Sequence, residues 1–223
     1  MSGGELHPEF FDLVGNVRAM RRLKPDPVPE ELIFKVLNAG VMAASGQNLQ
    51  PWEFVLVDDA EKKRWFADRY REAMDSRFRI PREELQDRDD KLARQLNAVI
   101  YQIDHMHETP YLLFVCGLRD WPFKVPQEER VGLAPPNYGA VYPCVQNILL
   151  ACRAVGLGAA LTTMHQVFEE ELMARFSIPD RYGVVVTMPI GDPMGTFGPV
   201  TRKPAREVTY FNEWGDLTPD GMA

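Results

Sequence analysis

The sequence predicts an α+β protein in which a central sheet is covered by helices. Apolar runs of strand length occur together with segments of helical periodicity, so both kinds of element are present. The first two strand candidates, residues 52–57 and 111–118, are separated by a long charged segment of helical character. That separation is too long for the repeated crossovers of a doubly wound parallel sheet. The 223 residues contain no repeat and no linker-like tract, which predicts a single domain over residues 1–223.

Composition excludes several classes of protein. The chain is 45% hydrophobic and 26% charged, as in an average globular domain, and its net charge of −7 argues against a nucleic-acid or basic membrane-binding surface. No apolar run reaches the roughly 18 residues of a membrane-spanning helix. Residues 1–13 carry no Lys or Arg and so do not have the form of a secretory signal. Three cysteines without paired spacing indicate a reduced, cytoplasmic protein.

The elements of the first half are predicted from periodicity and prolines. Apolar residues at helical spacing predict a helix over residues 30–44, and the prolines within residues 24–29 hold the preceding segment extended. Residues 45–51 form a polar turn-forming loop, and the apolar run 52–57 predicts a buried strand. Residues 60–107 are expected to be helical, with an interruption near Pro81.

In the second half, prolines within residues 119–137 exclude a long helix. The remaining predictions are a strand over 111–118, a helix over 140–155 ended by Gly156 and Gly158, a short strand over 159–163, a helix over 168–176, a strand over 182–191 and an extended piece over 206–211.

A cationic segment near the start is the first candidate site. It contains Arg18, Arg21, Arg22 and Lys24 with no acidic residue among them. On a helix, Arg18 would share a face with Arg21 or Arg22. Guanidinium groups that converge suit a phosphate, because each donates two parallel hydrogen bonds. A solvated basic turn explains the same residues.

Two uncharged segments are further candidates. The loop that contains Ser45, Asn48 and Gln50 offers neutral donors and acceptors, which suit the edge of a polar heterocycle better than acid–base chemistry. Thr162, Thr163 and Met164 follow a short apolar run, where hydroxyls and amides often face a ligand. An ordinary turn and ordinary strand threonines explain these patterns equally. A last candidate, Arg202 beside Lys203, lies in the Pro- and Gly-rich tail.

The sequence shows no motif for a catalytic nucleophile, a phosphate-binding loop or a metal site. There is no phosphate-binding glycine motif and no nucleophile elbow. His105 and His107 are two residues apart, which would place them on different faces of a helix, so no metal site is predicted. A cofactor would therefore have to supply the chemistry.

Taken together, these segments resemble the FMN-dependent nitroreductase family. The similarity is carried by residues 18–29, 45–54, 145–158, 189–191 and 202–204, and is most specific in Ser-Gly-x-Asn-x-Gln-Pro-Trp-x-Phe at 45–54. It implies a three-layer fold with a central, mostly antiparallel sheet wrapped by helices. It also implies an intertwined homodimer in which the tail, about residues 200–223, reaches the partner subunit.

The resemblance implies roles for the candidate residues. Arg18 and Arg21, with Arg22 as a further candidate, would meet the FMN phosphate and ribityl chain, and Arg202 would also meet the phosphate. Ser45, Asn48 and Gln50 would approach the isoalloxazine and ribityl side from the partner subunit. Thr162, Thr163 and the Met164 amide would lie along the ring near N5. Where the family commonly has Arg-Arg-Ser, this sequence has Val-Arg-Ala at residues 17–19, and Arg22 is the available replacement.

The activity implied is ping-pong hydride transfer from NADPH or NADH, through the flavin, to a nitro-aromatic, quinone or similar acceptor. Related alternatives are a reductive dehalogenase or an enone reductase, with residues 64–100 or 133–138 as a lid. A flavin-sequestering protein without turnover is an alternative of a different class. Val208, Tyr210, Phe211 and Trp214 make the tail apolar, so it packs either on its own domain or on a partner.

Overall fold

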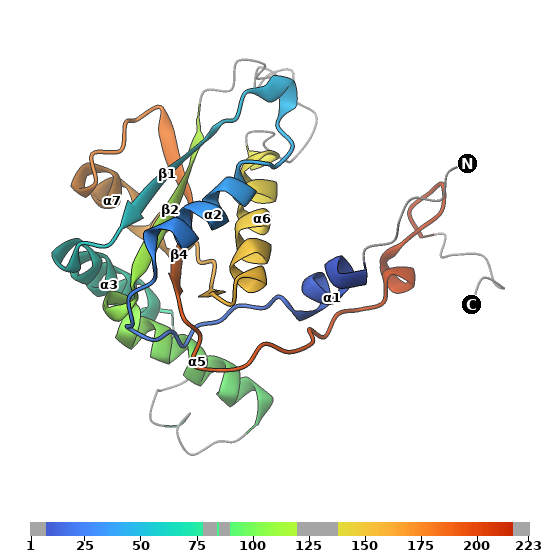
Figure 1. Cartoon of the computed structure of the whole chain (residues 1–223), viewed down its shortest axis with the longest axis horizontal. Coiled ribbons are helices and arrows are strands. Elements are labelled where there is room, and N and C mark those ends of the chain that lie inside the picture. Colours follow the sequence, from blue (N-terminus) through green and yellow to red (C-terminus); the bar gives the residue numbers. More distant parts are fainter. Residues whose placement is uncertain (1–7, 78–83, 85–89, 120–137, 216–223) are drawn as a thin grey trace.

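A computed structural model describes residues 8–77, 84, 90–119 and 138–215 (Figure 1). Its centre is a four-stranded sheet with strand order β1-β2-β4-β3, in which every pair of neighbours is antiparallel. The strands are β1 (Trp52–Val57), β2 (Tyr111–Leu118), β3 (Gly158–Ala159) and β4 (Tyr182–Gly191). The predicted bounds of β1, β2 and β4 are confirmed, because each is a mostly apolar run. β2 and β4 are almost wholly buried, whereas Glu53 of β1 is exposed.

The described residues form six α-helices around this sheet. They are α1 (Pro8–Asn16), α2 (Glu30–Gly40), α3 (Ala60–Asp75), α5 (Lys91–His105), α6 (Val141–Ala154) and α7 (Glu169–Arg175). Carboxylates cap two of them, since Asp59 accepts from the Lys62 amide and Asp90 from the Ala93 amide. At the end of α6, Gly156 has a φ of 84° and the Leu157 amide bonds to the Cys152 carbonyl, which terminates the helix as expected.

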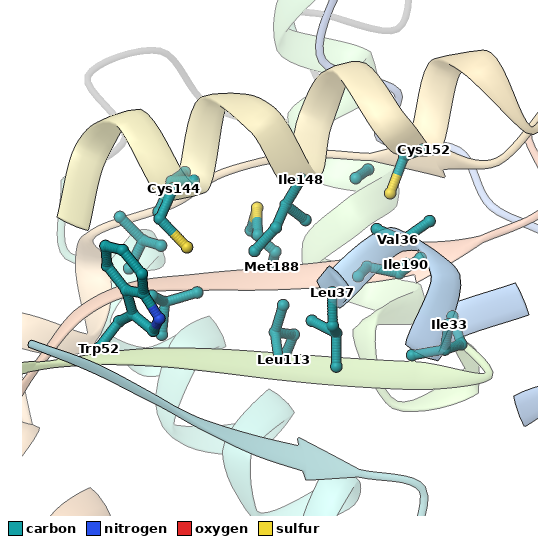
Figure 2. Close-up of a cluster of buried hydrophobic side chains, with 14 of the residues drawn as sticks. Ile33, Val36, Leu37, Trp52, Leu113, Cys144, Ile148, Cys152, Met188 and Ile190 are labelled. Carbon is teal, nitrogen blue, oxygen red and sulfur yellow. The ribbon is translucent and has the colours of Figure 1, made fainter. Parts of the chain in front are cut away.

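Helices cover both faces of the sheet. Along β2, Leu113 and Val115 point into a core formed with α2 and α6, shown in Figure 2. The alternating residues Leu112 and Phe114 point into a second core formed with α3, α5 and α7. The α+β class and the antiparallel sheet expected from the sequence are therefore confirmed.

β4 contains a one-residue bulge opposite β2, and on both sides of the bulge paired residues point to the same face of the sheet. Cys116 pairs with Val184 and Val115 pairs with Val186, so Val185 has no facing residue. Val185 and Val186 both belong to the core beneath α2 and α6, whereas Thr187 pairs with Phe114 on the other face. The bulge thus decides which side chains of β4 face α3.

The two ends of the described chain run side by side and leave the body together (Figure 1). The Lys24 amide donates to the Asp192 carbonyl, the Met194 amide to the Arg22 carbonyl and the Val200 amide to the Gly15 carbonyl. Residues 192–200 therefore lie along residues 15–24. Beyond them, the described tail reaches residue 215 with Trp214 90% exposed.

Several boundary predictions were wrong. The predicted helix 30–44 ends at Gly40, and the strand predicted over 159–163 is reduced to Gly158–Ala159 plus an isolated bridge between Thr162 and Thr187. The start of the extended piece predicted over 206–211 lies instead in a 3-10 turn over Ala205–Val208. The predicted interruption near Pro81 and most of the proline-rich stretch 119–137 fall outside the described residues. None of the helices in the described ranges is long and apolar enough to cross a bilayer.

Candidate functional site: a cationic cleft beside the sheet

A cleft with a volume of about 650 Å³ lies between residues 18–22 and the first half of α5. Arg18, Arg21 and Arg22 come from one wall, and Lys91 and Arg94 from the other. No aspartate or glutamate occurs among the described residues that line it. A concentration of positive charge in a protein of net charge −7 marks this cleft as a site for an anion.

The arginine-bearing wall is extended rather than helical, which corrects the expectation that Arg18 shares a helix face with Arg21 or Arg22. The Met20 amide donates to the Ala159 carbonyl, and Leu23 bridges to Pro193, so the backbone is used for pairing at the edge of the sheet. Gly158 allows this approach, because a Cβ at that position would lie 2.9 Å from the Met20 Cβ. Buried Met20 and Leu23 anchor the segment.

Each arginine of this wall meets a different group. The Arg18 Nη2 donates to the Thr196 carbonyl at 3.0 Å, which connects the wall to the tail. The Arg22 guanidinium lies over the Tyr101 ring at 5.8 Å, within the range of a cation–π contact. The positive charge of Arg21 acts on the Tyr70 hydroxyl. The cleft does not include the residues that follow β3.

Those residues, 162–167, are pinned to β4. Thr162 and Thr187 exchange two backbone hydrogen bonds of 2.9 and 3.0 Å. Three residues later, the buried His165 places its Nε2 2.7 Å from the Val184 carbonyl oxygen. Burial lowers the pKa of His165, so the ring is neutral at pH 7 and donates from Nε2 to this carbonyl. The Thr162–Met164 segment is therefore held rigidly against the sheet.

The predicted polar loop, residues 45–50, follows the C-terminal end of α2 (Figure 1) and is held by hydrogen bonds within the loop. The Gln50 amide donates to the Ser45 Oγ at 2.7 Å, and the Gln50 side chain donates to the Asn48 carbonyl at 3.4 Å. Gln47, Asn48 and Gln50 have φ values of 52°, 54° and 47°, a left-handed conformation that costs energy in residues other than glycine. Ser45, Asn48 and Gln50 do not line the cleft of their own chain.

Arg202 also lies apart from the cleft. Its side chain is exposed and donates from Nη1 to the Thr201 carbonyl at 2.9 Å. Within one chain the structure therefore brings Arg18, Arg21 and Arg22 together in the cleft. Arg202, the polar loop and the segment Thr162–Met164 do not line it.

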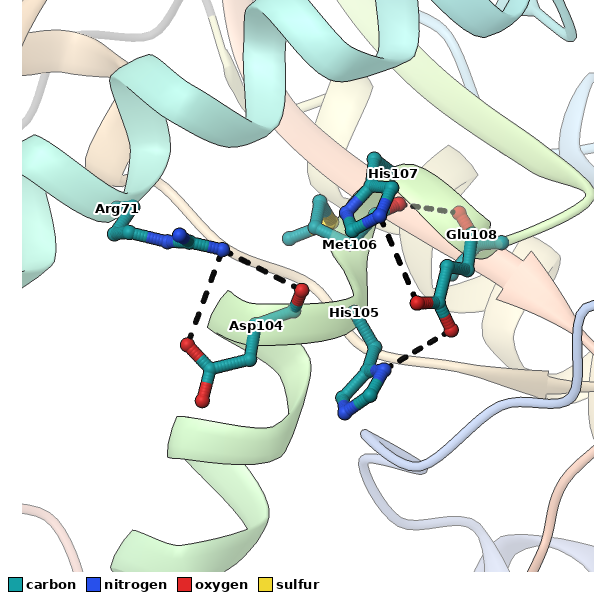
Figure 3. A network of polar contacts seen from close by, with 7 residues as sticks. Arg71, Asp104, His105, Met106, His107 and Glu108 are labelled. Atoms are coloured by element: carbon teal, nitrogen blue, oxygen red, sulfur yellow. Dashed lines mark hydrogen bonds and ion pairs between the residues drawn. The ribbon is translucent and has the colours of Figure 1, made fainter.

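The histidine pair at the end of α5 belongs to a polar cluster (Figure 3). His105 Nδ1 lies 3.0 Å and His107 Nε2 3.6 Å from the two carboxylate oxygens of Glu108. Arg71 reaches Asp104 in the same cluster. Burial lowers the pKa of His107, helped by the charge of Arg64. The contact between Arg71 and Asp104 thus joins the end of α5 to α3.

Sequence reasoning missed the second wall of the cleft. Lys91, Arg94, Gln95 and Ala98 have the spacing of one face of a helix, and Tyr101 continues this stripe. That spacing was visible in the sequence, but nothing in it indicates that the stripe faces residues 18–22. The Tyr70 and His165 contacts were likewise hidden, because they join segments distant in sequence.

A comparison with models of protein families matches residues 16–192 to the Nitroreductase family. The chain belongs to the nitroreductase family. The resemblance expected from its motifs is thereby confirmed, and the matched range includes both the cationic segment and residues 162–164.

Individual relatives agree with this assignment. The chain is 27% identical over 187 residues to an iodotyrosine deiodinase of Thermotoga neapolitana, a match that covers 82% of this chain and 88% of that relative. A local match to iodotyrosine deiodinase 1 of Rattus norvegicus is 40% identical over 55 residues and covers 25% of this chain. In such local matches the chain spans only 18% to 23% of the curated relative's own length.

A solved structure of the same fold is that of oxidized iodotyrosine deiodinase bound to FMN and 3-iodo-L-tyrosine. It superposes on this nitroreductase-family chain with a TM-score of 0.65 at 23% identity, and the match covers 87% of this chain and 95% of the other.

Proposed function

We propose that the protein is an FMN-dependent oxidoreductase that takes hydride from NADPH or NADH and transfers it to a nitro-aromatic, quinone or similar aromatic acceptor. The observation that carries this proposal is the cleft of about 650 Å³ in which Arg18, Arg21 and Arg22 face the cationic half of α5. Membership of the nitroreductase family is the reason for assigning this cleft to a flavin.

The residues of the cleft suit FMN. A phosphate monoester carries about −1.5 to −2 charges at neutral pH, and the arginine wall supplies cations without a nearby acid among the described lining residues. The volume lies within the usual range of roughly 300–1,000 Å³ for cofactor sites. Thr162 and Thr163 would offer hydroxyl and backbone groups to the edge of the ring. The Met164 amide, expected there as well, donates to the Thr162 Oγ1 at 3.4 Å in this structure.

When bound, FMN would supply reversible hydride transfer, which no side chain can provide. Arg18 and Arg21, assisted by Arg22, would bind the phosphate and ribityl chain. The pinned segment 162–164 would hold donors at fixed positions beside the ring, and preorganised donors of this kind tune a cofactor without reorganisation. The nicotinamide and the acceptor would use the same space in turn.

We also propose a homodimer in which each site takes residues from both chains. The exposed side chains of Phe10, Phe11, Phe211 and Trp214 support this, because large apolar groups gathered on an extended arm favour a partner surface. In such a dimer, Ser45, Asn48, Gln50 and Arg202 of one chain would reach the cleft of the other. The strained conformation of the 45–50 loop fits a segment shaped for contact with a ligand.

A reducing, cytoplasmic location is part of the same proposal. Cys116, Cys144 and Cys152 are buried and free, and burial raises the pKa of Cys116 and Cys152 to about 12. Thiols held in this protonated state are poor nucleophiles, so these cysteines act as core residues.

Reductive dehalogenation of an aromatic substrate is the second candidate. It is favoured by the match to an iodotyrosine deiodinase over most of both chains. The flavin, the dimer and the cleft would be the same, and only the acceptor would differ.

An anaerobic half-reaction tests the proposal. Purified protein reconstituted with FMN should lose its yellow colour when NADPH or NADH is added. An acceptor screen with a nitro-aromatic, a quinone and a halophenol, followed as oxidation of the nicotinamide, then distinguishes the two candidates. If a yellow holoprotein is bleached by neither nicotinamide, the protein is a flavin carrier rather than an enzyme.

Light scattering tests the shared site. The FMN-loaded protein should have twice the chain mass of 25.4 kDa. A particle of one chain mass that still binds FMN would refute the dimeric site while leaving the oxidoreductase proposal in place.

A further inference from the structure

We infer that Tyr70 is a positioning residue that fixes the direction of the Thr162 O–H bond and thereby the polarity of the hydrogen bond offered to the flavin. The inference rests on the proposed flavin site and adds to it a residue from α3, which neither the motifs nor the family comparison indicates.

Tyr70 is held in one orientation. It is 3% exposed, and its ring stacks on that of the fully buried Phe66, with centroids 6.0 Å apart and an interplanar angle of 18°. Its hydroxyl lies 3.3 Å from the Thr162 Oγ1. Thr162 is equally fixed, because two backbone hydrogen bonds tie it to Thr187.

The Thr162 oxygen receives a second donor from the other side. The Met164 amide donates to the same Oγ1 at 3.4 Å. A hydroxyl has one hydrogen and two lone pairs. Since Tyr70 and Met164 occupy both lone pairs, the Thr162 hydrogen has to point away from them and is available only as a donor to a third group.

Tyr70 remains a phenol at neutral pH. Burial raises the pKa of Tyr70 and outweighs the opposing effect of the Arg21 charge. The phenol therefore keeps the hydrogen that it donates.

A hydroxyl restricted to donating discriminates between two states of a flavin ring nitrogen such as N5. The nitrogen accepts a hydrogen bond in the oxidised ring and carries a hydrogen of its own in the reduced ring. Donation from Thr162 thus favours the oxidised form. With phenylalanine at position 70, Thr162 can rotate and accept, which favours the reduced form.

The test compares the wild type with Tyr70→Phe, Thr162→Val and the double variant, all loaded with FMN. Tyr70→Phe keeps the ring against Phe66, and a thermal melt of the apoprotein checks that folding is retained. We expect Tyr70→Phe to shift the ratio of reduced to oxidised flavin at a fixed potential by about threefold to tenfold toward the reduced form, since one hydrogen bond contributes on the order of a factor of 2 to 13. A tenfold shift raises the midpoint potential by about 30 mV.

The double variant decides whether Tyr70 acts through Thr162. In the Thr162→Val background, Tyr70→Phe should have no effect on the potential. The matched control, Tyr111→Phe on β2, removes a partly buried phenol elsewhere and should leave the potential unchanged. An unchanged potential in Tyr70→Phe, or an equal shift with and without the Thr162 hydroxyl, overturns the inference. Wild-type protein that binds no FMN would instead overturn the proposed function itself.

Discussion

The two faces of the sheet differ in the residues they bury. Under α2 and α6 the core is built from apolar side chains and the thiols of Cys144 and Cys152. All buried polar and charged residues of the described chain lie toward α3, α5 and α7: Lys63, Gln102, Thr109, His165 and Thr187. One face therefore contributes stability mainly through packing, with one hydrogen bond from Asn147 on α6 to the Ala39 carbonyl on α2. The other face combines packing with the hydrogen bonds that hold residues 162–167.

The largest effect is expected on the apolar face. Ile148 is fully buried in α6, so Ile148→Ala should lower the free energy of unfolding by roughly 2–5 kcal/mol. FMN affinity of the folded protein should not change, because Ile148 is absent from the cleft. Urea unfolding and FMN titration measure the two quantities.

A second substitution sharpens this prediction. A Cβ at Gly40 would lie 2.6 Å from the Ile148 Cγ1, so Gly40→Ala alone should also destabilise the protein. In the Ile148→Ala background that clash is removed, and the cost of Gly40→Ala should fall sharply. Additive costs would show that the two helices do not meet at this point.

Substitutions in the cleft should change FMN affinity more than stability. Arg21→Ala is expected to weaken FMN binding by about 10- to 100-fold, because a charge-assisted hydrogen bond contributes roughly 1.5–3 kcal/mol. Its effect on unfolding should be small, since Arg21 lies on the cleft wall. Fluorescence titration of the apoprotein measures the affinity, with the exposed Arg181→Ala, outside the cleft, as a control. Equal losses in the two variants would contradict a specific phosphate contact.

His165 should make the polar face sensitive to acid. Because burial lowers the pKa of His165, the unfolded imidazole takes up a proton near pH 6.5 that the folded one does not. The free energy of unfolding should therefore fall as the pH drops below that value.

His165→Gln removes the pH-dependent contribution of the imidazole to the free energy of unfolding. Its amide can still donate to the Val184 carbonyl, so a loss of about 1–2 kcal/mol at pH 7.5 is expected together with a shallower decline toward pH 5.5. His107 keeps part of the decline, because its pKa is also lowered. Urea unfolding at the two pH values measures both effects, and identical pH dependence in both proteins would exclude His165 as a source.

The smallest effect is expected at Thr187. Its hydroxyl is 3.5 Å from the Thr162 carbonyl, which already accepts the Thr187 amide at 3.0 Å. Thr187→Val should thus cost no more than about 1 kcal/mol in urea unfolding. A larger loss would mean that the polar face depends on every hydroxyl and not mainly on its backbone pairing.

The sequence was sufficient for the parts of the fold that depend on local pattern. Strands β1, β2 and β4 are mostly apolar runs, and their bounds follow from this local pattern. The spacing of residues 18–22 would place two arginines on one face of a helix, but pairing of Met20 with Ala159 and of Arg22 with Met194 determines the conformation of this segment. α1 was not predicted, although Pro8 at its first position and Glu9 in its first turn are typical of a helix start.

The candidate site was predicted in part for the same reason. The arginines near residue 20 are visible as an acid-free cluster, whereas the wall from α5 and the phenol from α3 depend on packing between distant segments. Ser45, Asn48 and Gln50 remain predictions that concern a second chain, and the phosphate contact of Arg202 also remains a prediction.

The bulge in β4 determines how the protein would tolerate an in-frame deletion of one codon. In a central strand, loss of one codon ordinarily turns every following side chain to the wrong side. Val185 is unmatched on β2, so its removal would leave the pairs Cys116–Val184 and Val115–Val186 facing as before. Deletion of this single residue would therefore leave the other side chains of β4 on the faces of the sheet where they now lie.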